Sequence, residues 1–257
     1  MQSIRLQNTI KALLLIGMGL FLYSRIANGT LFYYINERFM GFTLIAVFGL
    51  LAVGLSYRMP GAKAVQADHG HDHGHDHGHE HAGHSHALSW GGVLLVALPI
   101  ALGLLTPPQP LGVAALSNRE MNLQLNRTTQ AATVRPGEKA AVDKNLLDWW
   151  REFQTVPNAN EALAGQPVKA IGFVYHDDRY DANSFMLIRF TVSCCVADAS
   201  VVGLLVQWPA DQIPTDDTWV EVSGAFVSST LAEWNLPIVA AQQVTPIEIP
   251  QQPYLYP

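Results

Sequence analysis

The sequence predicts a membrane α-helical N-terminal region, with about three transmembrane helices, joined to an all-β C-terminal domain. Two observations predict this fold class. Only 14% of the residues are charged, against about a quarter in soluble globular domains. The apolar residues form long runs before position 113 and short alternating runs after about position 165. Long runs suit a bilayer and alternation suits half-buried strands, so the two parts of the chain belong in different environments.

The first two apolar runs predict two membrane helices. The run at 10–26 holds Lys11 and Arg25 near its ends, where long basic side chains can reach the interfaces. A cleavable signal peptide is the alternative for this run, because Arg5 and Lys11 precede or begin an apolar core. The run at 39–57 contains no charged residue and predicts a second span.

A third apolar run, at 87–106, also lacks charge but contains Pro99. Proline is tolerated in membrane helices, so this run predicts a kinked third span. A re-entrant or interfacial segment is the alternative. Residues 1–112 are therefore assigned to the transmembrane region. The sparse Lys and Arg residues in its loops favour a cytoplasmic N terminus and an extracytoplasmic C-terminal domain.

A His-rich loop, residues 68–86, separates the second and third runs. Its nine histidines are His69, His71, His73, His75, His77, His79, His81, His84 and His86. Gly, Asp and Glu residues lie between them, so a mobile backbone can bring several imidazoles to one ion. This ligand set indicates Zn²⁺ or another transition metal, bound with low specificity. The alternative is a solvated linker whose affinity for metal is incidental.

The rest of the chain predicts a tether over 113–142 and a water-exposed domain over 143–257. A short helix, DKNLLDWWREFQ, leads the domain, with Asp143 as its N-cap and Leu146, Leu147, Trp150 and Phe153 on one face. Period-two alternation then predicts strands at 168–175, 184–194, 200–208, 219–227 and 236–249. Five short strands favour an OB-like barrel, and a small sandwich is the alternative.

Two adjacent cysteines lie at the end of the second predicted strand. Alternation places Cys194 in the core and Cys195 outward. If the strand ends or bulges there, both sulfurs and Asp198 can converge on one thiophilic ion. Structural cysteines and redox chemistry are the alternatives, although the lack of a CxxC motif disfavours thioredoxin-like exchange.

Charge and motifs exclude two classes of function. A net charge of -6 provides no basic surface for a phosphate backbone, so no nucleic-acid partner is expected. The sequence contains no Ser-His-Asp order, phosphate-binding loop or zinc-protease motif, so an enzyme is not expected either. Membrane lipid is the first expected partner.

The segment RFTVSCCVADAS, with VKAIGFV before it and WVEVSGAFV and PQQPYLYP after it, resembles the YcgQ-like family of two-component membrane permease complex subunits. The resemblance implies a bacterial plasma (inner) membrane protein that is an accessory permease subunit. It also implies a polytopic YcgR-like permease as the partner. Since that partner is similar to organoarsenical efflux permeases, a transition-metal or thiophilic solute is expected. A membrane-tethered metal-binding or sensing module without transport activity is the alternative.

Overall fold

The computed structural model describes residues 2–57, 90–116, 139–229 and 237–257. The His-rich loop, residues 68–86, lies outside the described residues. The chain divides into two compact units. The helical unit comprises Met1–Leu31 and Arg38–Pro108, and the barrel unit comprises Phe32–Glu37 and Gln109–Pro257.

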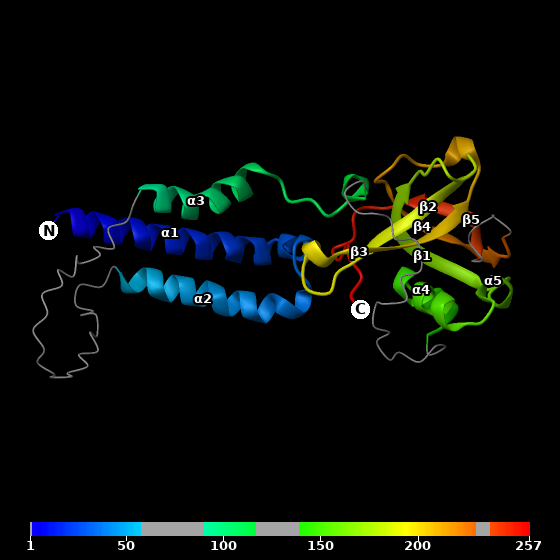
Figure 1. The fold of residues 1–257 in the computed structure, drawn as a ribbon, viewed down its shortest axis with the longest axis horizontal. Helices are drawn as coiled ribbons and strands as arrows, with labels where there is room; N and C mark the ends of the chain where they lie inside the picture. Colours follow the sequence, from blue (N-terminus) through cyan, green and yellow to red (C-terminus); the bar gives the residue numbers. More distant parts are fainter. Residues whose placement is uncertain (1, 58–89, 117–138, 230–236) are drawn as a thin grey trace, which may run out of the picture. The chain divides into compact units, whose positions relative to one another are not determined.

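Three helices form the helical unit: α1 (Gln2–Ala27), α2 (Met40–Ser56) and α3 (Trp90–Leu105). In Figure 1, α1 lies between α2 and α3. Gly54 in α2 is buried, and a Cβ added to it would lie 2.8 Å from Ile16 Cγ1. Glycine therefore permits the close approach of α1 and α2, as small residues do in membrane helix pairs.

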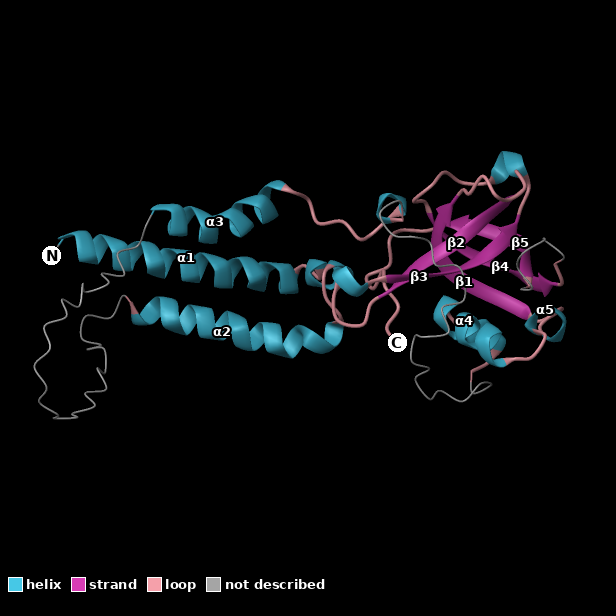
Figure 2. Ribbon diagram, viewed as in Figure 1, coloured by secondary structure: helices cyan, strands magenta, loops and turns pink. Residues whose placement is uncertain are grey.

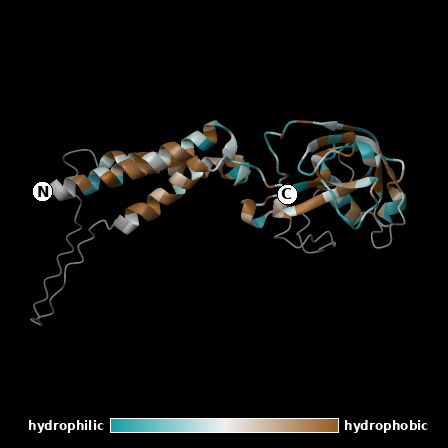
Figure 3. Cartoon of the chain, turned by 90° about the horizontal axis from the view of Figure 1, so that it is seen from above, coloured by the Kyte–Doolittle hydropathy of each residue, from teal (hydrophilic) through white to brown (hydrophobic). Residues whose placement is uncertain are grey.

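Most residues of these helices are hydrophobic (Figure 3), and several of their large apolar side chains are exposed. Phe42, Ile45 and Phe48 on α2 are 70%, 69% and 66% exposed. Two helices, Leu6–Ala27 and Glu37–Ser56, are long and apolar enough to cross a membrane. The described part of α3 has 16 residues, a length of about 24 Å against a hydrocarbon layer of about 30 Å. A third span therefore stays a prediction.

Five strands form the barrel unit's closed sheet, in the order β1-β2-β3-β5-β4 (Figure 2). They are β1 (Pro167–Tyr175), β2 (Ser184–Thr191), β3 (Ser200–Gln207), β4 (Trp219–Val227) and β5 (Ile238–Pro246). β3 and β5 pair in parallel, and the neighbouring pairs are antiparallel. The predicted five-stranded barrel is confirmed, and its strand order fits the Greek-key barrels to which OB-folds belong.

The leading helix, α4 (Leu146–Thr155), begins three residues after the predicted N-cap, Asp143. Asn145 is the N-cap: its Oδ1 accepts hydrogen bonds from the backbone N–H of Leu147 (2.9 Å) and of Asp148 (3.0 Å). The Asp148 carboxylate accepts in return from the Asn145 N–H, which completes a capping box. The prediction of Asp143 was wrong, because that residue ends a short 3-10 turn.

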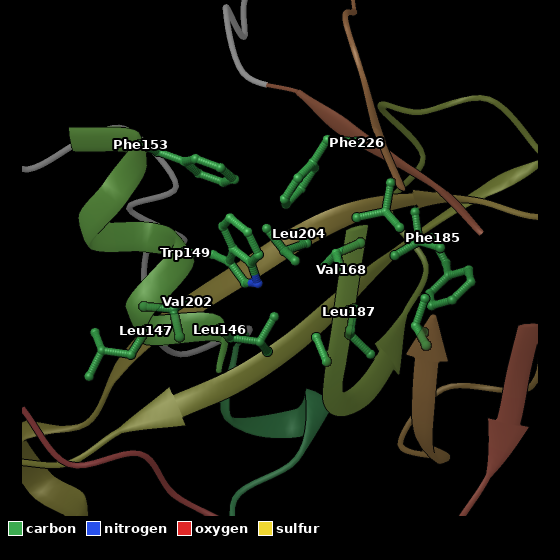
Figure 4. Packing of buried hydrophobic residues seen from close by; sticks show 14 of the residues in the cluster. Leu146, Leu147, Trp149, Phe153, Val168, Phe185, Leu187, Val202, Leu204 and Phe226 are labelled. Atoms are coloured by element: carbon green, nitrogen blue, oxygen red, sulfur yellow. The ribbon is translucent and has the colours of Figure 1, made fainter. Parts of the chain in front are cut away.

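Helix α4 buries an aromatic cluster against the barrel (Figure 4). Trp149 is fully buried and meets the ring of Phe226 edge-on, with 4.8 Å between centroids. Phe153 contacts the same ring at 5.7 Å. Trp149, rather than the predicted Trp150, is the central tryptophan, while Trp150 packs half-buried at the margin of the cluster. This packing fills the space between α4 and the sheet with apolar side chains.

Candidate functional site

The cysteine turn, residues 192–198, follows β2 and carries both cysteines. β2 ends at Thr191, and a 3-10 turn at Val196–Asp198 leads into β3. Cys194 is exposed and Cys195 is half-buried, with 3.7 Å between their sulfurs. The predicted core position of Cys194 was wrong, because the strand ends before the alternation in the sequence does. The early strand end is the condition under which both sulfurs can face one ligand.

Asp198 holds the backbone of the cysteine turn. Its Oδ2 accepts a hydrogen bond from the Cys194 N–H (2.7 Å), and its Oδ1 accepts one from the Ser193 N–H (3.2 Å). Partial burial raises the pKa of Asp198, but hydrogen bonds led by that from Cys194 outweigh it and leave the pKa below its usual value. Asp198 is therefore ionised at neutral pH and lies beside both cysteines.

The charge of Asp198 acts on the neighbouring thiol. A hydrogen bond with the Asp198 carboxylate, followed by one with the Cys195 thiol, raises the pKa of Cys194 to about 11, and the negative charge of Asp198 adds to this shift. Cys194 is therefore a protonated thiol at neutral pH, and a metal ion must displace its proton to bind the sulfur. The site is accordingly expected to bind metal more tightly as pH rises.

The connecting segment, Phe32–Glu37, belongs to the barrel unit although it lies between α1 and α2 in the chain. Its backbone pairs with the cysteine turn: the Asn36 N–H donates to the Cys194 carbonyl (3.0 Å) and the Val196 N–H donates to the Tyr34 carbonyl (2.9 Å). The pairing is an antiparallel bridge between Ile35 and Cys195. Two distant parts of the sequence thus build one turn.

Asn36 strengthens this attachment with its side chain. It is 2% exposed, and its Nδ2 donates to the carbonyls of Val192 (3.3 Å) and Ser193 (3.0 Å). Sequence reasoning missed this residue. The sequence feature that could have identified Asn36 is its polar side chain between the aromatic LFYY segment and the second apolar run. Such a pattern is common in turns, so it does not indicate a special role.

The C-terminal tail also makes hydrogen bonds to the start of the cysteine turn and to the end of β2. The Val192 N–H donates to the Leu255 carbonyl (3.0 Å), and the Leu255 N–H donates to the Phe190 carbonyl (2.9 Å). Tyr254 is buried, and its hydroxyl donates to the Tyr33 carbonyl at 3.1 Å. The tail therefore closes the barrel unit and holds the connecting segment beside the cysteine turn.

The other histidine of the sequence lies away from the cysteines. His176 follows β1, and its Nδ1 lies 2.7 Å from Asp216 Oδ1. Because the 176–183 loop precedes β2 and the cysteine turn follows it, the two lie at opposite ends of that strand. Within the described ranges, no group of three or more His, Cys, Asp or Glu side chains gathers as a metal centre. The cysteine turn thus offers a pair of sulfurs.

A small cavity lies on another part of the barrel. Its lining includes Trp150, Tyr180, Met186, Leu205 and Ile238, and its volume is about 30 Å³. Such a space holds a water molecule or two. Its lining is mainly apolar and includes no charged side chain.

A helical region with two candidate spans, followed by a closed barrel that carries one exposed and one half-buried cysteine, defines a class of membrane-associated barrel proteins. Within that class, the chain belongs to the DUF1980 family. The family's N-terminal domain matches residues 10–122, and its C-terminal domain matches residues 124–257. The resemblance to YcgQ-like proteins is confirmed.

Two relatives support this assignment. UPF0703 protein YcgQ of Bacillus subtilis (strain 168) is 29% identical over 111 residues, which cover 42% of this chain and 39% of YcgQ. The chain thus spans about two fifths of that relative's length. A Streptococcus mutans serotype c (strain ATCC 700610 / UA159) protein, named "Putative two-component membrane permease complex subunit", is 26% identical over 211 residues, covering 67% of this chain and 77% of that protein. No solved structure matches the chain.

Proposed function

We propose that this chain is an accessory subunit of a membrane permease complex that handles transition-metal or thiophilic solutes. The observation that carries the proposal is the relationship to the Streptococcus mutans protein, which covers 67% of this chain and is named as a permease complex subunit. That name describes a permease subunit and not an enzyme. The two apolar helices support a place in the membrane, here the bacterial plasma membrane.

The composition of the helices supports an accessory role. α2 and the described α3 contain no charged residue, and the charged residues of α1 are Arg5, Lys11 and Arg25. Conduction paths for polar solutes are lined by polar groups or backbone carbonyls. A separate polytopic partner, of the YcgR-like kind, would supply that path, while the barrel binds or presents the solute.

Two features support the solute class. Nine histidines between 68 and 86 are ligands suited to Zn²⁺ or another transition metal. The sulfurs of Cys194 and Cys195 lie 3.7 Å apart, and thiolates are the ligands that soft ions prefer. Histidine nitrogen and cysteine sulfur share an affinity for zinc and copper.

Co-purification tests the proposal. The tagged full-length chain is isolated from mildly solubilised membranes of its own cells, and the proteins that accompany it are identified. A polytopic membrane protein at a fixed ratio to the chain is expected, and it should persist when residues 69–86 are deleted. A chain that is isolated alone, under conditions that preserve a known membrane complex of the same cells, contradicts the proposal and favours a tethered sensing module.

A further inference from the structure

We propose that Cys194 and Cys195 form a two-sulfur site for a single thiophilic metal ion, in which Asp198 and Asn36 position the ligands without touching the metal. The inference deepens the proposed function by naming the chemistry of the solute site, and it rests on that function only for the role of the bound ion.

The distance between the two sulfurs fits two ligands of one ion. Thiolates lie about 2.3 Å from zinc and its substitutes, and two of them on a tetrahedral ion are about 3.8 Å apart. The sulfurs of Cys194 and Cys195 lie 3.7 Å apart. A disulfide would require them to approach to about 2.05 Å. The pair therefore spans one edge of a tetrahedral site with little movement.

The bonds made by Asp198 assign it a positioning role. Both of its carboxylate oxygens already accept backbone N–H groups, from Ser193 and from Cys194. These bonds fix the backbone that carries the first sulfur. The carboxylate also provides negative charge near an incoming cation, which favours the metal-bound state without a direct bond.

Asn36 fixes the carbonyl side of the same turn. Its amide donates to the carbonyls of Val192 and Ser193, and its backbone N–H donates to the Cys194 carbonyl. Because Asn36 is buried, solvent does not readily replace these bonds. Metal affinity at the cysteines is therefore expected to depend on the connecting segment, as it does on outer residues of other metal sites.

The site leaves part of the coordination sphere open. In the part of the chain that the structure describes, no third His, Cys, Asp or Glu joins the cysteines as a metal group. Two sulfurs fill half of a tetrahedral sphere, and water or a ligand from another molecule takes the remainder. Closed four-ligand sites hold structural ions, whereas an open position allows exchange. An exchangeable ion suits a subunit that passes its solute to a partner.

Cobalt(II) tests the site directly. The reduced full-length chain in detergent is titrated with Co²⁺, and the thiolate-to-cobalt charge-transfer absorption is measured. Histidine-bound cobalt does not give this absorption, so the His-rich loop does not obscure it. At saturating Co²⁺ we expect a band in the wild-type chain with the intensity of one cysteine-bound ion per chain, a loss of most of its intensity in Cys194→Ser and in Cys195→Ser, and no change in Gln243→Ala on the exposed face of β5.

Variants of the positioning residues, Asp198 and Asn36, should change the cobalt data in a different way from the cysteine variants. Asn36→Ala should weaken cobalt binding by roughly tenfold or more, while the band intensity per bound ion and the ligand-field spectrum stay unchanged in both Asn36→Ala and Asp198→Asn. A changed ligand-field spectrum in Asp198→Asn would make Asp198 a ligand and overturn its assigned role. A wild-type chain without the charge-transfer band overturns the site. Either result leaves co-purification with a permease untouched, so the two proposals fail separately.

Discussion

At the residue scale, the cysteine turn depends on side chains that the local sequence does not single out. Cys194 and Cys195 continue the alternation of β2, yet the turn places Cys194 in solvent. Asp198 was predicted as a ligand, and the structure shows it accepting backbone hydrogen bonds at the same turn. Asn36 lies more than 150 residues away in the chain, and no local pattern predicts such a partner.

Replacing Asn36 by alanine should destabilise the barrel unit. The change removes two side-chain hydrogen bonds and leaves the carbonyls of Val192 and Ser193 without these donors, which costs about 1–3 kcal/mol. Denaturant unfolding of the full-length chain in detergent, followed by tryptophan fluorescence, measures the change. Gln243→Ala is the control, with an expected effect within about 0.5 kcal/mol. Equal stabilities of the two variants would show that Asn36 does not hold the turn.

The charge of Asp198 should slow alkylation of Cys194. In the Cys195→Ser background, Cys194 is the remaining thiol, and the thiolate is the reactive form. The neighbouring carboxylate raises the pKa of Cys194, so the rate with iodoacetamide should still be rising well above pH 9. Asp198→Asn should lower that pKa and increase the rate at neutral pH several-fold. The same alkylation rate at each pH with and without Asp198→Asn would show that Asp198 does not raise the pKa of Cys194.

Asp198 should also link turn stability to pH. Its pKa is lower in the folded chain than its usual value of 3.8, so its contribution to stability is present above that value. The contribution is lost as pH falls through the lower, folded pKa. Unfolding measured between about pH 2 and pH 6 should therefore show a steeper acid loss in the wild type than in Asp198→Asn. Parallel curves would contradict this linkage.

At the element scale, alternation predicts where the strands lie but not where every one of them ends. The strands observed at Pro167–Tyr175 and Trp219–Val227 agree closely with their predicted ranges. β2 ends early because the chain turns toward β3 after Thr191, where the Asn36 side chain donates to the carbonyls of Val192 and Ser193. That partner comes from tertiary structure, so the apolar pattern of TVSCC does not reveal it. Helical spacing likewise predicted α4, but it placed Trp150 on the buried face, whereas Trp149 is the buried tryptophan. Either of two adjacent tryptophans can face a core, so spacing does not distinguish them.

Truncation of Phe226 should strongly weaken the contact between α4 and the barrel. Phe226 is fully buried between Trp149 and Phe153, and Phe→Ala changes in cores cost about 3–5 kcal/mol. Phe226→Leu, with an expected loss of about 1–2 kcal/mol, serves if the alanine variant does not fold. Denaturant midpoints provide the measurement. The neighbouring Val227→Ala is the matched control because Val227 is 37% exposed, and an equal loss there would contradict the packing.

At the scale of the whole molecule, composition predicts two environments, and the structure has two units. Apolar runs predicted α1 and α2, and an alternating pattern predicted the barrel. The sequence did not predict that Phe32–Glu37 belongs to the barrel unit, because this segment lies between two apolar runs. Its backbone pairing with Cys194 and Cys195 depends on contacts between distant residues, which periodicity cannot show.

A charge on the outer face of α2 should oppose membrane insertion. Ile45 is 69% exposed and lies near the middle of the candidate span Glu37–Ser56. Ile45→Lys should raise the apparent free energy of insertion by about 3 kcal/mol, while Ile45→Leu leaves it nearly unchanged. A reporter of helix insertion, with the segment in its natural flanks, measures both. Equal insertion of the two variants would argue that α2 does not meet lipid at this position.

The metal content of cells tests most directly the proposed role in a permease for transition-metal or thiophilic solutes. Cells lacking the chain are compared with cells restored by the wild type or by Cys194→Ser with Cys195→Ser, each across a range of Zn²⁺ and other transition-metal concentrations. We predict that loss of the chain alters the cellular content or flux of at least one such ion, and that the wild type, but not the double serine variant, restores it. Identical content and flux in all three strains at every concentration would contradict the account.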